Sequence, residues 1–306
     1  MILSEVQVWS LVVKSHSMNI KVGGILDRIY PDSRVSSIKK FSKGAINNTY
    51  SFKVKSKDFV LRIHSDNFWK IKKEAYMYEL IAKKTDIPVP NVVKTGKDYL
   101  LITKIKGKEI SVNNKKLVRK SGEILAKLHS IKFPSYGWIV GDKIKPSFNM
   151  WEDFIYYDVK QKLKKIPSKS ALLKKNIKKI VDENKSLLKI NSKPCLLHKD
   201  YHASHILVHN GAINGIIDIE WAMAGHNELD LAKTSLWMFK NKPELEKIFL
   251  QGYKKYGKVS KEFKERQRLY KLLTSFSSLS FSYECRNRKW CIYNLNELEG
   301  EINEYH

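Results

Sequence analysis

The spacing of apolar residues changes near Gly107, and this change constrains the fold more than any other feature of the chain. Over residues 35–63 and 91–105, short runs of β-branched and aromatic residues are bounded by turn residues, as in antiparallel strands. Beyond Gly107 the apolar positions recur every three or four residues, as in helices. We therefore expect an α+β protein with two lobes, a small antiparallel sheet lobe over 1–106 and a larger, mainly helical lobe over 107–306.

The first lobe is expected to hold about five strands and one helix. The strands are predicted at 36–41, 49–54, 58–63, 91–93 and 99–105. The helix contains Ile71 and Tyr78 and should end before Pro88, because proline disfavours a helical residue ahead of it. In the second lobe, helices are predicted around 117–128, 151–163 and 172–188, and short strands at 195–197, 206–208 and 215–219.

Two aspartates stand close to these short strands, Asp200 after the first and Asp218 in the last. Transfer of a γ-phosphoryl group requires one carboxylate that orients and deprotonates the attacking hydroxyl. It requires a second carboxylate on the Mg²⁺ ion that bridges the phosphates. The two aspartates suit these two roles and indicate a phosphotransferase.

The segments Leu197–Leu207 and Ile216–Glu220 resemble the H-x-D-x-x-x-x-N and I-D-x-E signatures of the aminoglycoside phosphotransferase and choline kinase superfamily. The similarity extends over about residues 35–255. It implies a protein-kinase-like fold and transfer of the γ-phosphate of ATP or GTP, with Mg²⁺, to an acceptor hydroxyl. The combined motifs are specific, although none of them is specific alone.

The same resemblance assigns roles to individual residues. It implies that His198 supports the catalytic loop, that Asp200 is the catalytic base and that Asp218 is the principal Mg²⁺ ligand. Asp230, within a Glu-Leu-Asp-Leu-Ala segment, matches the structural aspartate of the family. One position departs from the pattern: the family's metal-binding asparagine is His205 here, as in the macrolide kinases and the 2″-aminoglycoside kinases. Because Mg²⁺ prefers oxygen ligands, the second metal contact stays open at this point.

On the nucleotide side, the resemblance implies that Arg62 holds the α- and β-phosphates and that Glu74 pairs with it. The segment 42–49 corresponds to the phosphate loop and the segment 99–105 to the hinge that meets the purine. The residues expected to contact nucleotide in these segments are Gly44, Asn47, Asn48, Thr103 and Ile105.

The histidines and tryptophans allow other interpretations. His198, His202, His205 and His209 would line one face if they were helical, which could indicate zinc. Because the flanking residues read as a strand that enters a turn, we expect these histidines not to converge. Trp221, Trp237 and the other aromatic residues are predicted to lie in the core, and His129 is predicted to be a packed structural residue.

The charge of the chain is unusual, with 57 Lys and Arg against 31 Asp and Glu, a net charge of +26. Twelve lysines between Lys160 and Lys193 face only Asp182 and Glu183, a local net charge of +10. Such a field attracts polyanions. The leading hypothesis is therefore a kinase with an anionic acceptor, favoured to be RNA such as the ribose 2′-hydroxyl of a tRNA.

Two alternatives stay open. The first is a small-molecule kinase of the aminoglycoside, macrolide, choline or sugar type, which the charge of the acceptor would distinguish. The second is a catalytically weak pseudokinase that binds nucleotide and RNA, which His205 and the glycine-poor phosphate loop favour. The three cysteines are Cys195, Cys285 and Cys291, and their irregular spacing indicates no disulfide framework. With no leader peptide and no apolar run that could span a membrane, a cytoplasmic location is expected, and the oligomeric state is left open.

Overall fold

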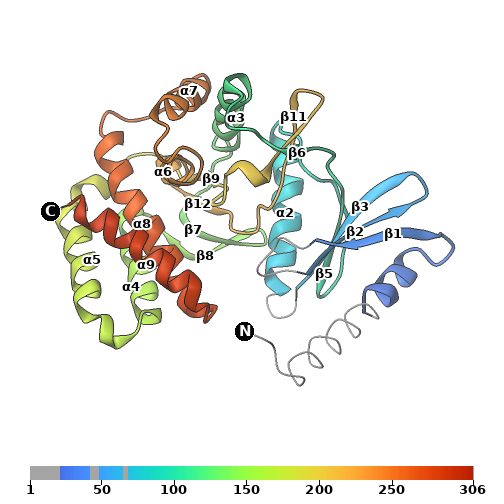
Figure 1. Ribbon diagram of the computed structural model, residues 1–306, viewed down its shortest axis with the longest axis horizontal. Coiled ribbons are helices and arrows are strands. Elements are labelled where there is room, and N and C mark those ends of the chain that lie inside the picture. The colour runs from blue at the N-terminus through green and yellow to red at the C-terminus, as the bar shows by residue number, and fades with distance from the viewer. Residues whose placement is uncertain (1–20, 42–47, 65–67, 306) are drawn as a thin grey trace. The chain divides into compact units, whose positions relative to one another are not determined.

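The computed structural model describes residues 21–41, 48–64 and 68–305 (Figure 1). It contains two compact units, one made of Met1–Asp66 and Val93–Lys104 and the other of Asn67–Val92 and Ile105–His306. Antiparallel sheets and helices together confirm the predicted α+β class. The division into lobes at residues 106 and 107 stays a prediction.

The first unit is built on one sheet of five strands in the order β1-β2-β3-β5-β4. Their bounds are β1 Val35–Lys40, β2 Asn48–Val54, β3 Lys57–Ile63, β4 Val92–Thr95 and β5 Tyr99–Thr103. The side chains of Phe52 and Phe59 stack with ring centroids 5.7 Å apart, because these residues are register partners on β2 and β3. A helical segment at 21–29 packs Val22, Ile25 and Leu26 into the same core.

The second unit holds the remaining helices and two smaller sheets, with the orders β11-β10-β6 and β8-β7-β12-β9. The helices are α2 Phe68–Lys84, α3 Lys115–Leu128, α4 Trp151–Lys165, α5 Ala171–Glu183, α6 Asn227–Met238, α7 Pro243–Tyr253, α8 Phe263–Glu284 and α9 Arg288–Asn303, with single 3-10 turns η1 Ser168–Ser170, η2 Lys185–Leu188 and η3 Ala203–His205. The strands are β6 Lys108–Glu109, β7 Tyr136–Val140, β8 Lys143–Phe148, β9 Cys195–Leu197, β10 Ile206–His209, β11 Ala212–Ile216 and β12 Met223–Gly225.

The core of this unit surrounds Trp151, which is fully buried and whose indole donates a 2.7 Å hydrogen bond to the Tyr270 hydroxyl. Helix α6 carries acidic residues in its first turn, where the helix dipole favours them. Arg266 on α8 donates a 2.5 Å hydrogen bond to Glu228, and this buried ion pair fixes the start of α6 against α8. Within the described residues, no helix is both long and apolar enough to cross a membrane.

Several predicted elements differ in extent from those observed. The strand expected at 215–219 is β11, which ends at Ile216, because Asp218 takes a left-handed backbone conformation with φ of +63°. The helix expected over 172–188 breaks into α5 and η2. The hairpin β7–β8 had no predicted counterpart, because Gly137 and Pro146 interrupt the apolar pattern of its two strands.

Candidate active site

The candidate site begins in the turn after β9, where His198, Lys199 and Asp200 follow one another. Lys199 has a φ of +65°, a conformation that costs an L-residue about 1–2 kcal/mol. The turn is held by the carboxylate of Asp230 on α6. Its two oxygens accept hydrogen bonds from the backbone amides of His198 at 2.7 Å and Lys199 at 2.9 Å. Asp230 therefore holds the backbone of the turn that carries Asp200.

Asp230 is buried together with a second histidine. His129 donates from Nε2 to the same carboxylate at 3.3 Å, while its Nδ1 accepts a 2.8 Å hydrogen bond from the Tyr253 hydroxyl. Burial alone would raise the pKa of Asp230, but the hydrogen bond and charge of His129, followed by His198 and Lys199, lower it. Asp230 is thus an ionised anchor, and the predicted packing of His129 is confirmed.

His198 connects the two loops that carry the aspartates. Its Nδ1 accepts the backbone amide of Asp200 at 3.2 Å, and its Nε2 donates to the carbonyl of Ile217 at 3.1 Å. The side chain is fully buried, and burial, followed by the charge of His205, lowers its pKa to about 4. His198 is therefore a neutral imidazole that fixes the distance between the loop of Asp200 and the loop of Asp218.

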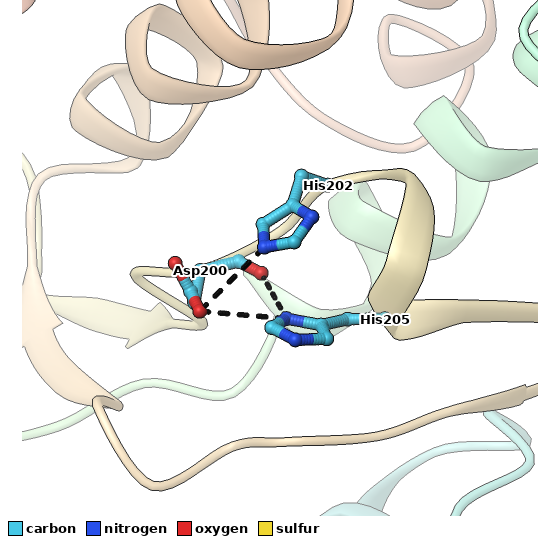
Figure 2. Close-up of side chains that lie close together, drawn as sticks. All are labelled: Asp200, His202 and His205. Carbon is cyan, nitrogen blue, oxygen red and sulfur yellow. Dashed lines mark hydrogen bonds and ion pairs between the residues drawn. The ribbon is translucent and has the colours of Figure 1, made fainter. Parts of the chain in front are cut away.

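The carboxylate of Asp200 has cationic or imidazole groups on both sides. Its Oδ1 lies 3.3 Å from the Nζ of Lys233. Its Oδ2 lies 3.7 Å from His202 Nε2 and 3.5 Å from His205 Nδ1 (Figure 2). Burial by itself would raise the pKa of Asp200, but Lys233, followed by His202 and His205, outweighs burial and holds this pKa well below its usual range. Asp200 is therefore available as a carboxylate near neutral pH.

His205 lies between the two aspartates. Its Nδ1 donates a 2.8 Å hydrogen bond to the backbone carbonyl of Asp200, and its Nε2 lies 3.4 Å from Oδ2 of Asp218. Because a carbonyl can only accept, Nδ1 carries a proton, and in the neutral tautomer of the ring Nε2 would carry the lone pair. Asp218 is positioned in turn by its amide, which donates to the Tyr78 hydroxyl at 3.0 Å.

The pair formed by His205 Nε2 and Asp218 Oδ2 fits a metal ion. Histidine ligands commonly donate their other ring nitrogen to a carbonyl or carboxylate, and His205 does so toward Asp200. Ligand atoms of Asp200, His202 and His205 also lie within 4.8 Å of one another. In that group the nitrogen of His205 that lies beside Asp200 is Nδ1, which carries a proton and cannot bind a metal ion at the same time. The pair of His205 Nε2 and Asp218 Oδ2 is therefore the better set of metal ligands.

The expectation that the histidines would not converge is wrong for two of them. The ring centroids of His202 and His205 lie 4.1 Å apart, because the 3-10 turn η3 folds the chain back on itself. His209 lies exposed at the end of β10.

Two residues beside Asp200 were not identified from the sequence as parts of the site. Lys233 on α6 contacts Asp200, donates to the carbonyl of Lys199, and lies 4.0 Å from the ring centre of Trp237. The side chain of Trp237 is 43% exposed, so its predicted place in the core is wrong. Lys233 and Trp237 are four positions apart and follow shortly after Asp230 in the sequence. This spacing is the signal that could have placed both residues on one face of the helix.

The residues expected to contact nucleotide belong to both units. In the first unit Asn48 begins β2, Arg62 lies buried in β3 and Thr103 ends β5. In the second unit Glu74 lies buried in α2 and Ile105 follows β5. Gly44 and Asn47 lie outside the described residues. The nucleotide contacts and the pairing of Arg62 with Glu74 stay predictions.

Comparisons with known proteins add to this geometry. Residues 37–265 match the model of a family described as the phosphotransferase enzyme family. No match was found among curated proteins. Among solved structures, a thermostable mutant of the aminoglycoside phosphotransferase APH(4)-Ia, in a ternary complex with AMP-PNP and hygromycin B, is similar with a TM-score of 0.71 and 18% identity, over 92% of this chain and 97% of that one.

Two other solved structures show the same fold. The gentamicin complex of APH(2″)-IIa has a TM-score of 0.68 and 17% identity, over 91% of this chain and 97% of that one. A putative fructosamine-3-kinase from Thermobifida fusca YX-ER1 has a TM-score of 0.67 and 15% identity, over 89% and 98%. Similarity at this level of identity shows a common fold, which is the kinase-like fold expected from the motifs.

Proposed function

Because the chain belongs to the phosphotransferase enzyme family, we propose that it transfers the γ-phosphoryl group of ATP to a hydroxyl group of a small-molecule acceptor. The resemblance to the aminoglycoside phosphotransferase and choline kinase superfamily is confirmed, and the chain is a phosphotransferase enzyme. The observation that carries the proposal is the position of His205, which contacts both Asp200 and Asp218.

Asp200 acts as the general base. As the acceptor oxygen forms its bond to the γ-phosphorus, the bond from that phosphorus to the β,γ-bridging oxygen breaks and ADP leaves. The proton of the acceptor hydroxyl passes to the carboxylate of Asp200. Lys233 contacts Oδ1 of this carboxylate, and the imidazoles of His202 and His205 lie beside Oδ2.

His205 and Asp218 would hold the metal ion that accompanies the nucleotide. Mg²⁺ held there would neutralise the negative charge of the phosphates. The nitrogen ligand departs from the all-oxygen set that Mg²⁺ prefers, so we expect Mn²⁺ to support turnover as well. The AMP-PNP in a structural relative supports ATP as the donor, and use of GTP has no comparable support.

The small-molecule acceptor replaces RNA as the first choice. Hygromycin B and gentamicin occupy the structures of two relatives, and a third is named for a fructosamine. RNA remains a second candidate because of one observation: between Lys160 and Lys193, Lys162 and Lys174 are half-buried and the other ten lysines are exposed. The pseudokinase alternative is weakened because Asp200 and Asp218 both contact His205.

The test is γ-labelled ATP offered with sugars, aminoglycosides, macrolides, choline and total RNA. We expect label to move to a small molecule, and Asp200→Asn to reduce turnover by about 10²–10⁴-fold with unchanged affinity for ATP. Asp142→Asn is the matched control, because Asp142 is exposed in the turn between β7 and β8. Label found only in RNA would support the second candidate. Equal turnover in Asp200→Asn and the parent would refute the role of Asp200.

A further inference from the structure

Trp237 is a large aromatic side chain that stays exposed next to the proposed base. It lies near the end of α6, and Lys233, one turn earlier, places its Nζ 4.0 Å from the centre of the indole. The ring of His202 meets the same indole edge-on, with centroids 5.4 Å apart. A single exposed tryptophan needs no explanation by itself, but this one is held by two residues that also contact Asp200.

Lys233 connects the indole to the reacting group. Its Nζ lies 3.3 Å from Oδ1 of Asp200 and donates to the carbonyl of Lys199. The centre of the Trp237 ring can therefore lie no farther from this carboxylate oxygen than the 4.0 Å and 3.3 Å distances combined. A hydroxyl carried on a six-membered ring and directed at Asp200 would bring that ring within reach of the exposed indole.

We propose that Trp237, Lys233 and His202 form the acceptor subsite and that it takes a neutral or acidic ring polyol, such as a hexose or a hexuronic acid. The inference rests on the proposed function, because it requires Asp200 to be the base. The C–H face of a sugar ring packs against an indole, which offers a large rigid apolar surface. His202, edge-on to the indole, and Lys233, whose Nζ lies over one face of it, can bond to hydroxyl or carboxylate oxygens of a sugar on the other face.

The charge of the subsite selects the acceptor. The Nζ of Lys233 lies beside the base, the side chain is 14% exposed, and among the residues that the structure describes the only carboxylate in ion-pair contact with it is that of Asp200. An acceptor that carries an ammonium group would place it against Lys233, and like charges at close range repel. A carboxylate on the acceptor would instead be attracted. Polycationic acceptors are therefore disfavoured at this subsite.

The test compares Trp237→Ala, Trp237→Phe and Lys233→Met with the parent, using glucose, glucuronate, glucosamine and gentamicin as acceptors. Trp290→Ala is the matched control, since Trp290 is 38% exposed and lies on α9. We expect Trp237→Ala to raise the acceptor KM about tenfold with an unchanged KM for ATP, and Trp237→Phe to recover most of this loss. Lys233→Met should lower the ratio of kcat/KM for glucuronate to that for glucosamine about tenfold. This ratio is insensitive to any general loss of turnover.

Three results would overturn the inference. The first is an equal acceptor KM in Trp237→Ala and Trp290→Ala. The second is a parent enzyme that prefers glucosamine or gentamicin to glucose and glucuronate, or whose acceptor lacks a ring. The third is a glucuronate to glucosamine ratio that Lys233→Met leaves unchanged. Each of these three results is compatible with the proposed phosphotransferase activity. Failure to transfer label from ATP to any acceptor would refute the proposed function, and the acceptor subsite with it.

Discussion

Removal of the Asp230 carboxylate should destabilise the protein by a large fraction of its total stability. Asp230→Ala leaves the amides of His198 and Lys199 without their acceptor, at a site where Asp230 is buried. Hydrogen bonds to charged groups contribute about 1.5–3 kcal/mol each, so the two together account for about 3–6 kcal/mol. The free energy of unfolding of a domain is about 5–15 kcal/mol. The variant should therefore be marginally stable at 25 °C.

Urea denaturation of the parent, Asp230→Ala and Asp230→Asn measures this loss. Asn retains one carbonyl oxygen but turns an amide group toward the second backbone N–H, so an intermediate loss of about 2–3 kcal/mol is expected. Asp142→Ala serves as the control, because that exposed side chain should change the unfolding free energy by less than about 0.5 kcal/mol. Turnover should fall as well, since the turn that Asp230 holds carries Asp200.

The contribution of Asp230 also depends on pH. Its pKa in the folded state is lower than in the unfolded chain, so its stabilisation is complete above the unfolded value of about 3.9. As the pH falls through that value toward the lower folded pKa, the stabilisation is lost. The parent should therefore lose stability in acid more steeply than Asp230→Ala. A loss of less than about 1 kcal/mol in Asp230→Ala at pH 7 would refute the assignment of Asp230 as the anchor of the turn.

Three further predictions concern the metal, the departure from the family motif and the lysine-rich helices. Asp218→Ala should weaken binding of Mg-ATP together with turnover, and an unchanged dependence on Mg²⁺ would remove Asp218 from the metal site. His205→Asn should stay active and shift preference from Mn²⁺ toward Mg²⁺ in a metal titration; loss of activity with unaltered metal preference would assign His205 to packing of the loop. If RNA is bound, the logarithm of its binding constant should fall with the logarithm of the salt concentration, with a slope of about −0.7 to −0.9 per phosphate contact. Neutralising Lys175, Lys178 and Lys179 should make this slope less steep, and an unchanged slope would exclude these lysines from the interface.

Much of the secondary structure could be predicted because its signals are local. The alternating β-branched and aromatic residues of β3 predicted that strand to within one residue. The helix α2 ends at Lys84, ahead of Pro88, as the steric effect of proline requires. Hairpin β7–β8 escaped prediction because glycine and proline lie inside its strands, where long-range pairing, and not local preference, determines the structure.

The sequence by itself predicted which residues carry the chemistry, because the motif around Asp200 and Asp218 is a set of residue types at fixed spacing along the chain. It also determined the family, through the match over residues 37–265. The net charge of +26 is also a property of the sequence, but the sequence does not show on which surface the charges gather. The charge favoured RNA as the acceptor, whereas the structural relatives support a small molecule at least as well.

Only the tertiary structure decided how these groups are arranged. The carboxylate of Asp230 meets two amides about thirty residues earlier in the chain. The turn at η3 aims one nitrogen of His205 at a carbonyl and the other at Asp218. Trp237 is a large aromatic residue of the kind predicted to lie in the core, yet it is exposed beside Lys233. Periodicity reports which residues share a face of one element, whereas burial and orientation depend on what packs against that face, and these partners come from distant parts of the chain.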